Sequence, residues 1–264
     1  MKTIPLTKGN VFVYDFGSMK LHNYCTNDEL NDQVILLEKN HRLIVIESPT
    51  FYDNNEELEA YIRSLDVTID GVLLAYHMGG GTFLKDARKY ATHHADEYGH
   101  VGGGKALIDQ FTESFGEKFD CEIHHITDYI NQGEFTLGGI RLNIIPTADA
   151  YDIEIPEINC IYTHMLGSTC HSIVAGASHA NQIIATLKEY MEKDYRLILT
   201  SHYVPEEISA VDTKIAYIET LLNIASDCKG ASSFIQKMEQ EFPNYSGKNY
   251  LEMTASFFFS SDKR

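Results

Sequence analysis

Short apolar and β-branched runs separated by polar breaks predict a sheet near the start of the chain. Residues 11–16, 33–38 and 43–46 read VFVYDF, QVILLE and LIVI, and such runs are typical of strands. Residues 71–75, GVLLA, form a continuous apolar run, which is typical of a strand buried on both faces. The first third of the chain therefore predicts a strand meander followed by a buried strand.

Apolar residues at helical spacing predict helices between and after these strands. Leu58, Tyr61, Ile62 and Leu65 repeat at i, i+3, i+4 and i+7, the period of an amphipathic helix. Asp53, with an acid three positions later, is the capping pattern expected at the start of that helix. Further helical stripes occupy residues 181–192, 208–222 and 234–242. The simplest interpretation of these stripes is that the helices cover a sheet.

A second sheet is predicted in the middle of the chain. Residues 135–145 indicate a hairpin around Gly138-Gly139, and residues 158–162 and 197–199 indicate two more strands. His124 and His125 fall in an apparent strand, where only one of the two can face a given side. Since no Pro/Gly/Ser-rich linker interrupts the chain, we predict a single domain over 1–264, with a helical extension over 226–264. The glycine-rich stretch 100–104 is the one expected mobile loop.

Composition limits the class of function. The 264 residues include 21 Lys+Arg and 38 Asp+Glu, a net charge of −17, which disfavours nucleic-acid binding because phosphates are neutralised by Lys and Arg. No apolar run approaches the ~20 residues of a membrane helix, and the start MKTIPLTKGN lacks a signal-like stretch. Five scattered cysteines without a CxxC pair indicate reduced thiols. We expect a cytoplasmic protein that binds a small molecule, with no membrane or nucleic-acid partner.

Three histidines stand at the ends of three predicted strands. His77 follows 71–75, His164 follows 158–162 and His202 follows 197–199. Strand ends are where α/β proteins carry their sites, so the sequence predicts a metal or substrate pocket there. The alternative is that each histidine only shapes its loop through hydrogen bonds.

The order of these elements resembles the metallo-β-lactamase fold over residues 10–225. Val34–Pro49 is similar to the opening hairpin of that family, which ends in Asp-Thr-Gly, with Glu47 as the acid here. Gly71–Leu84 is similar to the strand and loop that carry the HxHxDH motif, and Ser201-His202 to the closing Gly-His. The resemblance implies the α/β class, as a four-layer αββα sandwich of two mixed sheets with helices on the outer faces. It also implies a metal-dependent hydrolase.

The motif itself departs from the family pattern. Positions one, three, five and six are His77, Gly79, Gly81 and Thr82, so only the first ligand is present. No histidine occurs at 146–149, and His164 stands where the family has a bridging aspartate. A binuclear centre needs more donors than this loop supplies.

Three imidazoles can hold one zinc with a fourth position open. We therefore predict a mononuclear site of His77, His164 and His202, with zinc first and iron or manganese as alternatives, and Asp152 as catalytic base, with Asp149 as its alternative. The predicted activity is hydrolysis of a small ester, thioester or lactone.

Two other interpretations of the function remain open. One is a metal-free, non-catalytic relative that binds a small molecule or partner in the vestigial pocket, because glycines in place of ligands leave space. The other is a subunit of a homo-oligomer, suggested by Phe257–Phe259, although these rings can equally pack on their own chain.

Four more histidines are weighed as substitute ligands. His93, His94 and His100 lie in a charged run after the motif, where a solvated face is the simpler explanation. His171 lies seven residues after His164, a spacing that some family members use.

Overall fold

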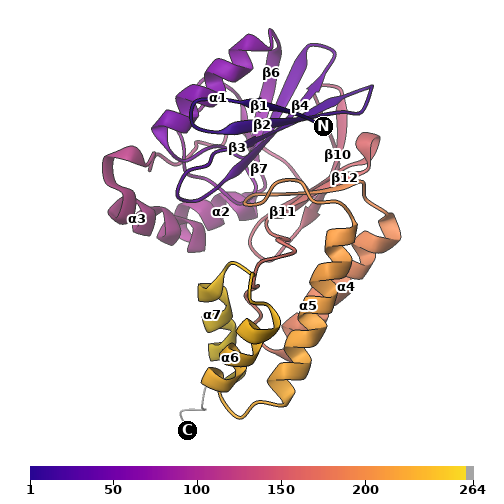
Figure 1. Cartoon of the computed structure of the whole chain (residues 1–264). Helices are drawn as coiled ribbons and strands as arrows, with labels where there is room; N and C mark the ends of the chain where they lie inside the picture. Colours follow the sequence, from indigo (N-terminus) through magenta and orange to yellow (C-terminus); the bar gives the residue numbers. More distant parts are fainter. Residues whose placement is uncertain (260–264) are drawn as a thin grey trace. The chain divides into compact units, whose positions relative to one another are not determined.

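Two mixed β-sheets hold the strands β1 to β13 of the computed structural model, which describes residues 1–259 (Figure 1). The first sheet has, in spatial order, β1 (Lys2–Pro5), β2 (Asn10–Asp15), β3 (Lys20–Cys25), β4 (Gln33–Lys39), β5 (Arg42–Ile46), β6 (Thr68–Leu73), β7 (Lys89–Ala91) and β8 (Asp128–Tyr129). Its pairs are antiparallel up to β5 and parallel from β5 onward. The meander and the buried strand predicted from the sequence are confirmed.

The second sheet lies in the order β13-β12-β11-β10-β9. Its strands are β9 (Gly133–Leu137), β10 (Ile140–Pro146), β11 (Tyr151–Ile155), β12 (Cys160–Thr163) and β13 (Leu197–Thr200). The predicted hairpin at Gly138-Gly139 is the β9–β10 turn, and β12 pairs with β13 in parallel. Two mixed sheets with helices give the α/β class that the sequence predicted.

Contacts divide the chain into two compact units. The first holds residues 1–165 and 197–205, with both sheets and the helices α1 (Tyr52–Ser64), α2 (His93–Val101) and α3 (Gly103–Phe115). The second holds 166–196 and the chain from Glu206 onward, with α4 (Ala177–Lys193), α5 (Ser209–Ser226), α6 (Ala231–Glu241) and α7 (Lys248–Phe259). Short 3₁₀ turns lie at Gly116–Lys118 and Pro156–Ile158. Residues 260–264 of the predicted extension fall outside the described residues.

The core of the first unit explains why β4 and β5 are continuous apolar runs. Both strands are buried along nearly their whole length. On one face lies α1, where Leu58 is buried and Tyr61 contacts His22 of β3, with 2.7 Å between the hydroxyl oxygen and Nδ1. On the other lies the second sheet, whose apolar residues share the same core. Strands buried on both faces need apolar residues at consecutive positions.

The second unit has its own helical core. Apolar residues of α4, α5, α6 and α7 pack together, with Tyr217 and Phe234 fully buried. Phe258 and Phe259 pack against this core, whereas Phe257 stays half exposed. Two of the three tail rings therefore pack within their own unit. Among residues 1–259, no helix has both the length and the apolar character needed to cross a membrane.

Three local predictions are wrong. The stretch 100–104 is not a loop, because α2 and α3 meet at Gly102 and the Tyr98 ring packs where side chains at Gly103 and Gly104 would lie. His124 and His125 lie outside any strand, although they do alternate between buried and exposed. Helix α1 starts at Tyr52, with Asp53 in its first turn rather than as its cap.

A tyrosine hydroxyl that joins the two sheets is a measurable part of this core. Tyr151 of β11 donates to the Leu74 carbonyl at 2.9 Å and is fully buried. We expect Tyr151→Phe to lower the free energy of unfolding by about 1–3 kcal/mol, because a buried acceptor loses its donor. Urea unfolding measures this. Tyr129→Phe, at an exposed tyrosine bonded to Asp96, is the matched control and should change stability by less than about 0.5 kcal/mol. Equal losses in both variants would contradict this account of the sheet contact.

Candidate metal site

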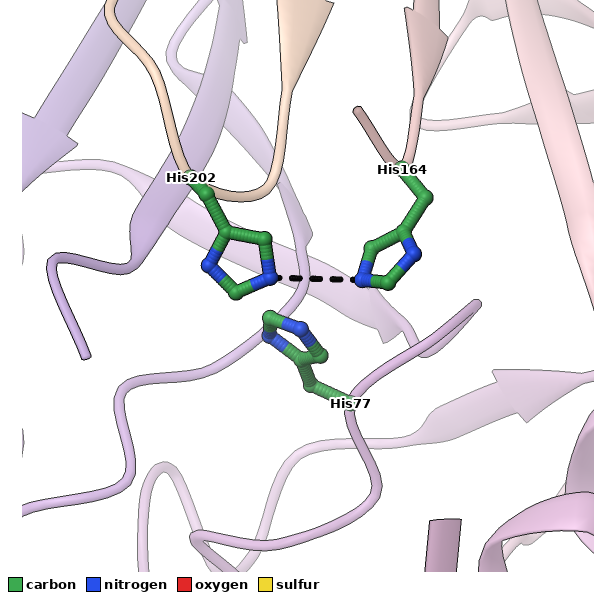
Figure 2. Close-up of side chains that lie close together, drawn as sticks. All are labelled: His77, His164 and His202. Atoms are coloured by element: carbon green, nitrogen blue, oxygen red, sulfur yellow. Dashed lines mark hydrogen bonds between the residues drawn. The ribbon is translucent and has the colours of Figure 1, made fainter. Parts of the chain in front are cut away.

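Three histidines from three strand ends of the first unit converge on one point. His77 follows β6, His164 directly follows β12 and His202 lies just after β13. Figure 2 shows their rings turned toward one another from three separate segments. Their nearest ligand nitrogens all lie within 4.8 Å of one another. The structure thus brings together the three residues that the sequence singled out.

The spacing of the nitrogens suits a metal ion. Nε2 of His164 and Nε2 of His202 face each other at 3.2 Å (Figure 2). A tetrahedral zinc with Zn–N bonds of about 2.0–2.1 Å places its ligand nitrogens ~3.3 Å apart. His77 completes the set, because its ligand nitrogen lies within 4.8 Å of the other two. Its ring lies at right angles to that of His164, with 5.6 Å between ring centres. In the described part of the chain this is the one group of three or more His, Cys, Asp or Glu side chains with metal-ligand spacing.

A buried carboxylate that the sequence reading missed stands behind the histidines. Asp32, in the loop between β3 and β4, has Oδ1 3.2 Å from Nδ1 of His202 and 4.0 Å from Nδ1 of His77. Neither Oδ1 of Asp32 nor Nδ1 of His77 reaches the geometry of a full hydrogen bond. Buried polar atoms are nearly always bonded, so the cluster holds two buried polar atoms whose bonding is incomplete within the protein itself.

The charges of this cluster shift its pKa values in opposite directions. Burial raises the pKa of Asp32, but the charge of His77 and the contacts with His202 outweigh it and leave the pKa lowered. Burial lowers the pKa of His202, and the contact with Asp32 outweighs it and leaves the pKa raised. Burial, with the charges of His77 and His202, holds the pKa of His164 well below its usual range. His164 is therefore neutral at pH 7, the form that binds metals.

Glu47 fixes the chain around the histidines. It follows β5, is fully buried and accepts hydrogen bonds from the main-chain N–H groups of Tyr76 and His77, at 2.8 and 3.0 Å. Its third donor is the hydroxyl of Tyr162, at 2.6 Å, which also contacts Ser201 Oγ at 2.6 Å. One carboxylate thus ties together the segments that carry all three histidines.

The loop after His77 is closed by main-chain packing. A side chain at Gly80 would meet the Pro49 carbonyl at 2.0 Å, and one at Gly81 would meet the main chain of Glu122 at 2.8 Å. Thr82 donates to the buried Asp120 through its hydroxyl, at 2.5 Å. At Gly80 and Gly81, the room that side chains would take is filled by neighbouring residues.

Asp152 lies next to the cluster without joining it. Its Oδ1 accepts a hydrogen bond from the hydroxyl of Tyr76 at 2.7 Å, and the Tyr76 ring stacks on His164 with 4.6 Å between ring centres. The structure therefore connects Asp152 to His164 through Tyr76, and its role as a base stays a prediction. Asp149 is exposed.

The other candidate histidines have partners elsewhere. His93 stacks on Tyr129, His94 contacts the Ala148 carbonyl and His100 pairs with Asp96. His171 belongs to the second unit, where its Nδ1 lies 3.0 Å from the Tyr217 hydroxyl. None of the four belongs to the converging set.

Asp32 carried only a weak signal in the sequence. It ends the polar stretch TNDELND between two buried strands, and such a stretch is usually solvated. Its neighbours show why it is held inward. Asn31 Nδ2 donates to the His202 carbonyl at 3.3 Å, and Gln33 N donates to the Ser201 carbonyl at 2.7 Å.

Comparison with known proteins identifies the fold. No family profile matches the sequence, and neither does any curated protein. Among solved structures, a metallo-beta-lactamase family protein from Thermus thermophilus is similar with a TM-score of 0.60 and 13% identity, over 91% of each chain. A metallo-beta-lactamase from Erythrobacter litoralis has a TM-score of 0.55 and 15% identity, over 83% of this chain and all of its own.

A stereoselective inverting sec-alkylsulfatase from Pseudomonas sp. gives a TM-score of 0.63 and 13% identity over 95% of this chain, which spans only 50% of the sulfatase. At sequence identities this low, the similarity to these structures shows the fold and carries no information about function. The chain therefore has the metallo-β-lactamase fold that the sequence resemblance implied.

Proposed function

We propose that this protein is a metal-dependent hydrolase with one divalent ion, held by His77, His164 and His202. The convergence of the three imidazoles at strand ends from both sheets carries the proposal. An all-imidazole set suits zinc, with iron or manganese as alternatives. Three protein ligands leave a coordination position open, which is the arrangement of catalytic rather than structural zinc sites.

The surrounding residues favour an ion at this position. Nδ1 of His77 and Oδ1 of Asp32 are buried without well-formed hydrogen bonds, and a carboxylate behind ligating histidines is a common feature of metal sites. When bound, a divalent ion supplies Lewis-acid chemistry and activates water for hydrolysis. The chain supplies three imidazole rings, a fixed main chain at His77 and a carboxylate behind two of the ligands.

One ion rather than two follows from the closed loop. The family pattern requires an aspartate at position 81 and a histidine at 82. Gly81 lies too close to the main chain of Glu122 for any side chain, and the Thr82 hydroxyl is committed to Asp120.

The substrate class is a small molecule with a hydrolysable ester-type bond. Structures of this fold include an alkylsulfatase and β-lactamases by their names, so the same fold accommodates sulfate-ester and lactam cleavage. We propose a small ester, thioester or lactone for this chain, with Asp152 as the base; its carboxylate accepts from Tyr76, whose ring stacks on His164. Turnover across such a panel, with alkyl sulfates and β-lactams included, tests the activity.

Metal content is the direct test of the ligand set. Protein purified without added metal and without a histidine tag should contain about one equivalent of zinc, iron or manganese per chain. His202→Ala should lose it, because two imidazoles leave too few donors to hold the ion. Elemental analysis measures both. His41→Ala, which removes an exposed histidine from the β4–β5 turn, is the matched control and should keep the wild-type content.

The same measurement can overturn the proposal. Absence of metal after reconstitution would leave a metal-free binding protein, and about two equivalents would mean that further residues rebuild a binuclear centre. Metal retained in His202→Ala would show that the ligand set is wrong.

The closed loop gives a second prediction, on stability. Gly81→Ala should lower the free energy of unfolding by about 2 kcal/mol or more, because the new methyl group overlaps main-chain atoms of Glu122. Gly79→Ala is the matched control, since a methyl group there meets nothing closer than 3.6 Å. It should cost less than about 1 kcal/mol, as measured by urea unfolding. If both variants unfold alike, the loop is not closed in the way that excludes a second ion.

A further inference from the structure

Among residues 1–259, Asp32 is the one buried carboxylate that contacts the rings of two histidines of the cluster. Its side chain is 2% exposed, and Oδ1 is the atom that faces Nδ1 of both His202 and His77. Its other oxygen, Oδ2, accepts a hydrogen bond from the Thr50 hydroxyl at 3.1 Å. Oδ1 therefore faces the two histidines, whereas Oδ2 is bonded to Thr50.

The direction of the rings follows from this contact. The two nitrogens of an imidazole lie on different edges of the ring, so turning Nδ1 toward Asp32 leaves Nε2 facing away. For His202 that edge faces Nε2 of His164 at 3.2 Å (Figure 2). The side of His202 that faces Asp32 is therefore the Nδ1 edge, and the edge that faces the shared point is the Nε2 edge.

The charge of Asp32 has no permanent counter-ion. Within residues 1–259 no lysine or arginine pairs with it, and its ion-pair partners are His77 and His202 alone. Asp28, in the same loop, adds a like charge nearby. A buried carboxylate without a cation is costly, and a divalent ion on the two histidines supplies positive charge one ring away.

The β3–β4 loop is built to hold this arrangement. Asn31 and Gln33, on either side of Asp32, bond the main chain of His202 and Ser201. Both contacts fix the segment of His202 without using its ring. The ring itself contacts the Asp32 carboxylate, the main chain of Leu30 and the ring of His164.

We infer that Asp32 is a positioning residue for the metal, which orients His202 and His77 from behind and balances the charge of the bound ion. The carboxylate is not itself in the converging set of ligands. This inference rests on the proposed function, because it assumes that the three histidines hold an ion. Carboxylates that accept from a ligating histidine typically contribute about 10–100-fold to metal affinity.

The test compares metal affinities of purified variants by competition between the protein and a chromophoric chelator for Zn²⁺. Asp32→Asn should still take up about one equivalent, but with an affinity about 10–100-fold lower than that of the wild type. Thr50→Val is the matched control, because it removes the hydrogen bond to Oδ2 and leaves the charge that faces the histidines. It should stay within about threefold of the wild type.

The affinities of the variants separate the positioning role of Asp32 from the existence of the metal site. Wild-type affinity in Asp32→Asn, or an equal loss in Thr50→Val, would overturn the positioning role while leaving the metal site intact. A wild-type protein that takes up none of Zn²⁺, Fe²⁺ and Mn²⁺ would overturn the proposed function and this inference together. If Asp32→Asn does not fold, Asp32→Glu keeps the charge but displaces it, and lowered affinity there supports the role whereas unchanged affinity contradicts it.

Discussion

The hydrogen bonds of one buried carboxylate, Glu47, hold the site together. Its side chain reaches from the end of β5 to the main chain of Tyr76 and His77 and to the hydroxyl of Tyr162 on the other sheet. A carboxylate with three donors in a buried setting is strongly held, because the low local dielectric strengthens each bond. The main chain of Glu47 is itself left-handed, with φ of 67°, a conformation that costs energy and persists only where the surroundings fix it. The positions of the three histidines all depend on this point, because each belongs to a segment that Glu47 touches directly or through Tyr162.

The loop beyond His77 depends on a different interaction, the pairing of main chain with main chain. Gly80 and Gly81 donate to the carbonyls of Asp120 and Glu122, and His124 donates to that of Met78. This pairing requires glycine, because a Cβ at either position would fall on a neighbouring atom. The glycines therefore explain two things at once, the fixed course of the loop and the missing ligands. His77 keeps its place because Glu47 holds its N–H before the glycine segment begins.

Much of this could be predicted from the sequence, and the reasons for the failures are physical. The strands and helices follow from apolar periodicity, and the meeting of His164 and His202 follows from the rule that parallel strands end at one edge. His77 follows a strand of the other sheet, so its meeting with these two depends on the packing of the two sheets. Asp32 could not be found in this way, because its partner His202 is distant in sequence and their meeting depends on the pairing of Gln33 with Ser201. The stretch 100–104 was predicted as a loop because glycine disfavours helix. There the packing of the Tyr98 ring on the glycines overrides propensity.

The fold uses the main chain of residue 77 and does not require its imidazole ring. Glu47 binds the main-chain N–H of His77, so any residue other than proline would satisfy that contact. The imidazole adds a buried Nδ1 without a hydrogen-bond partner, and an unsatisfied buried nitrogen lowers stability. His164 differs, because its Nε2 contacts Nε2 of His202 and its ring stacks on Tyr76. The imidazole of His77 therefore lowers stability without serving the main-chain contact, and a side chain that the fold does not need is best explained by what it binds.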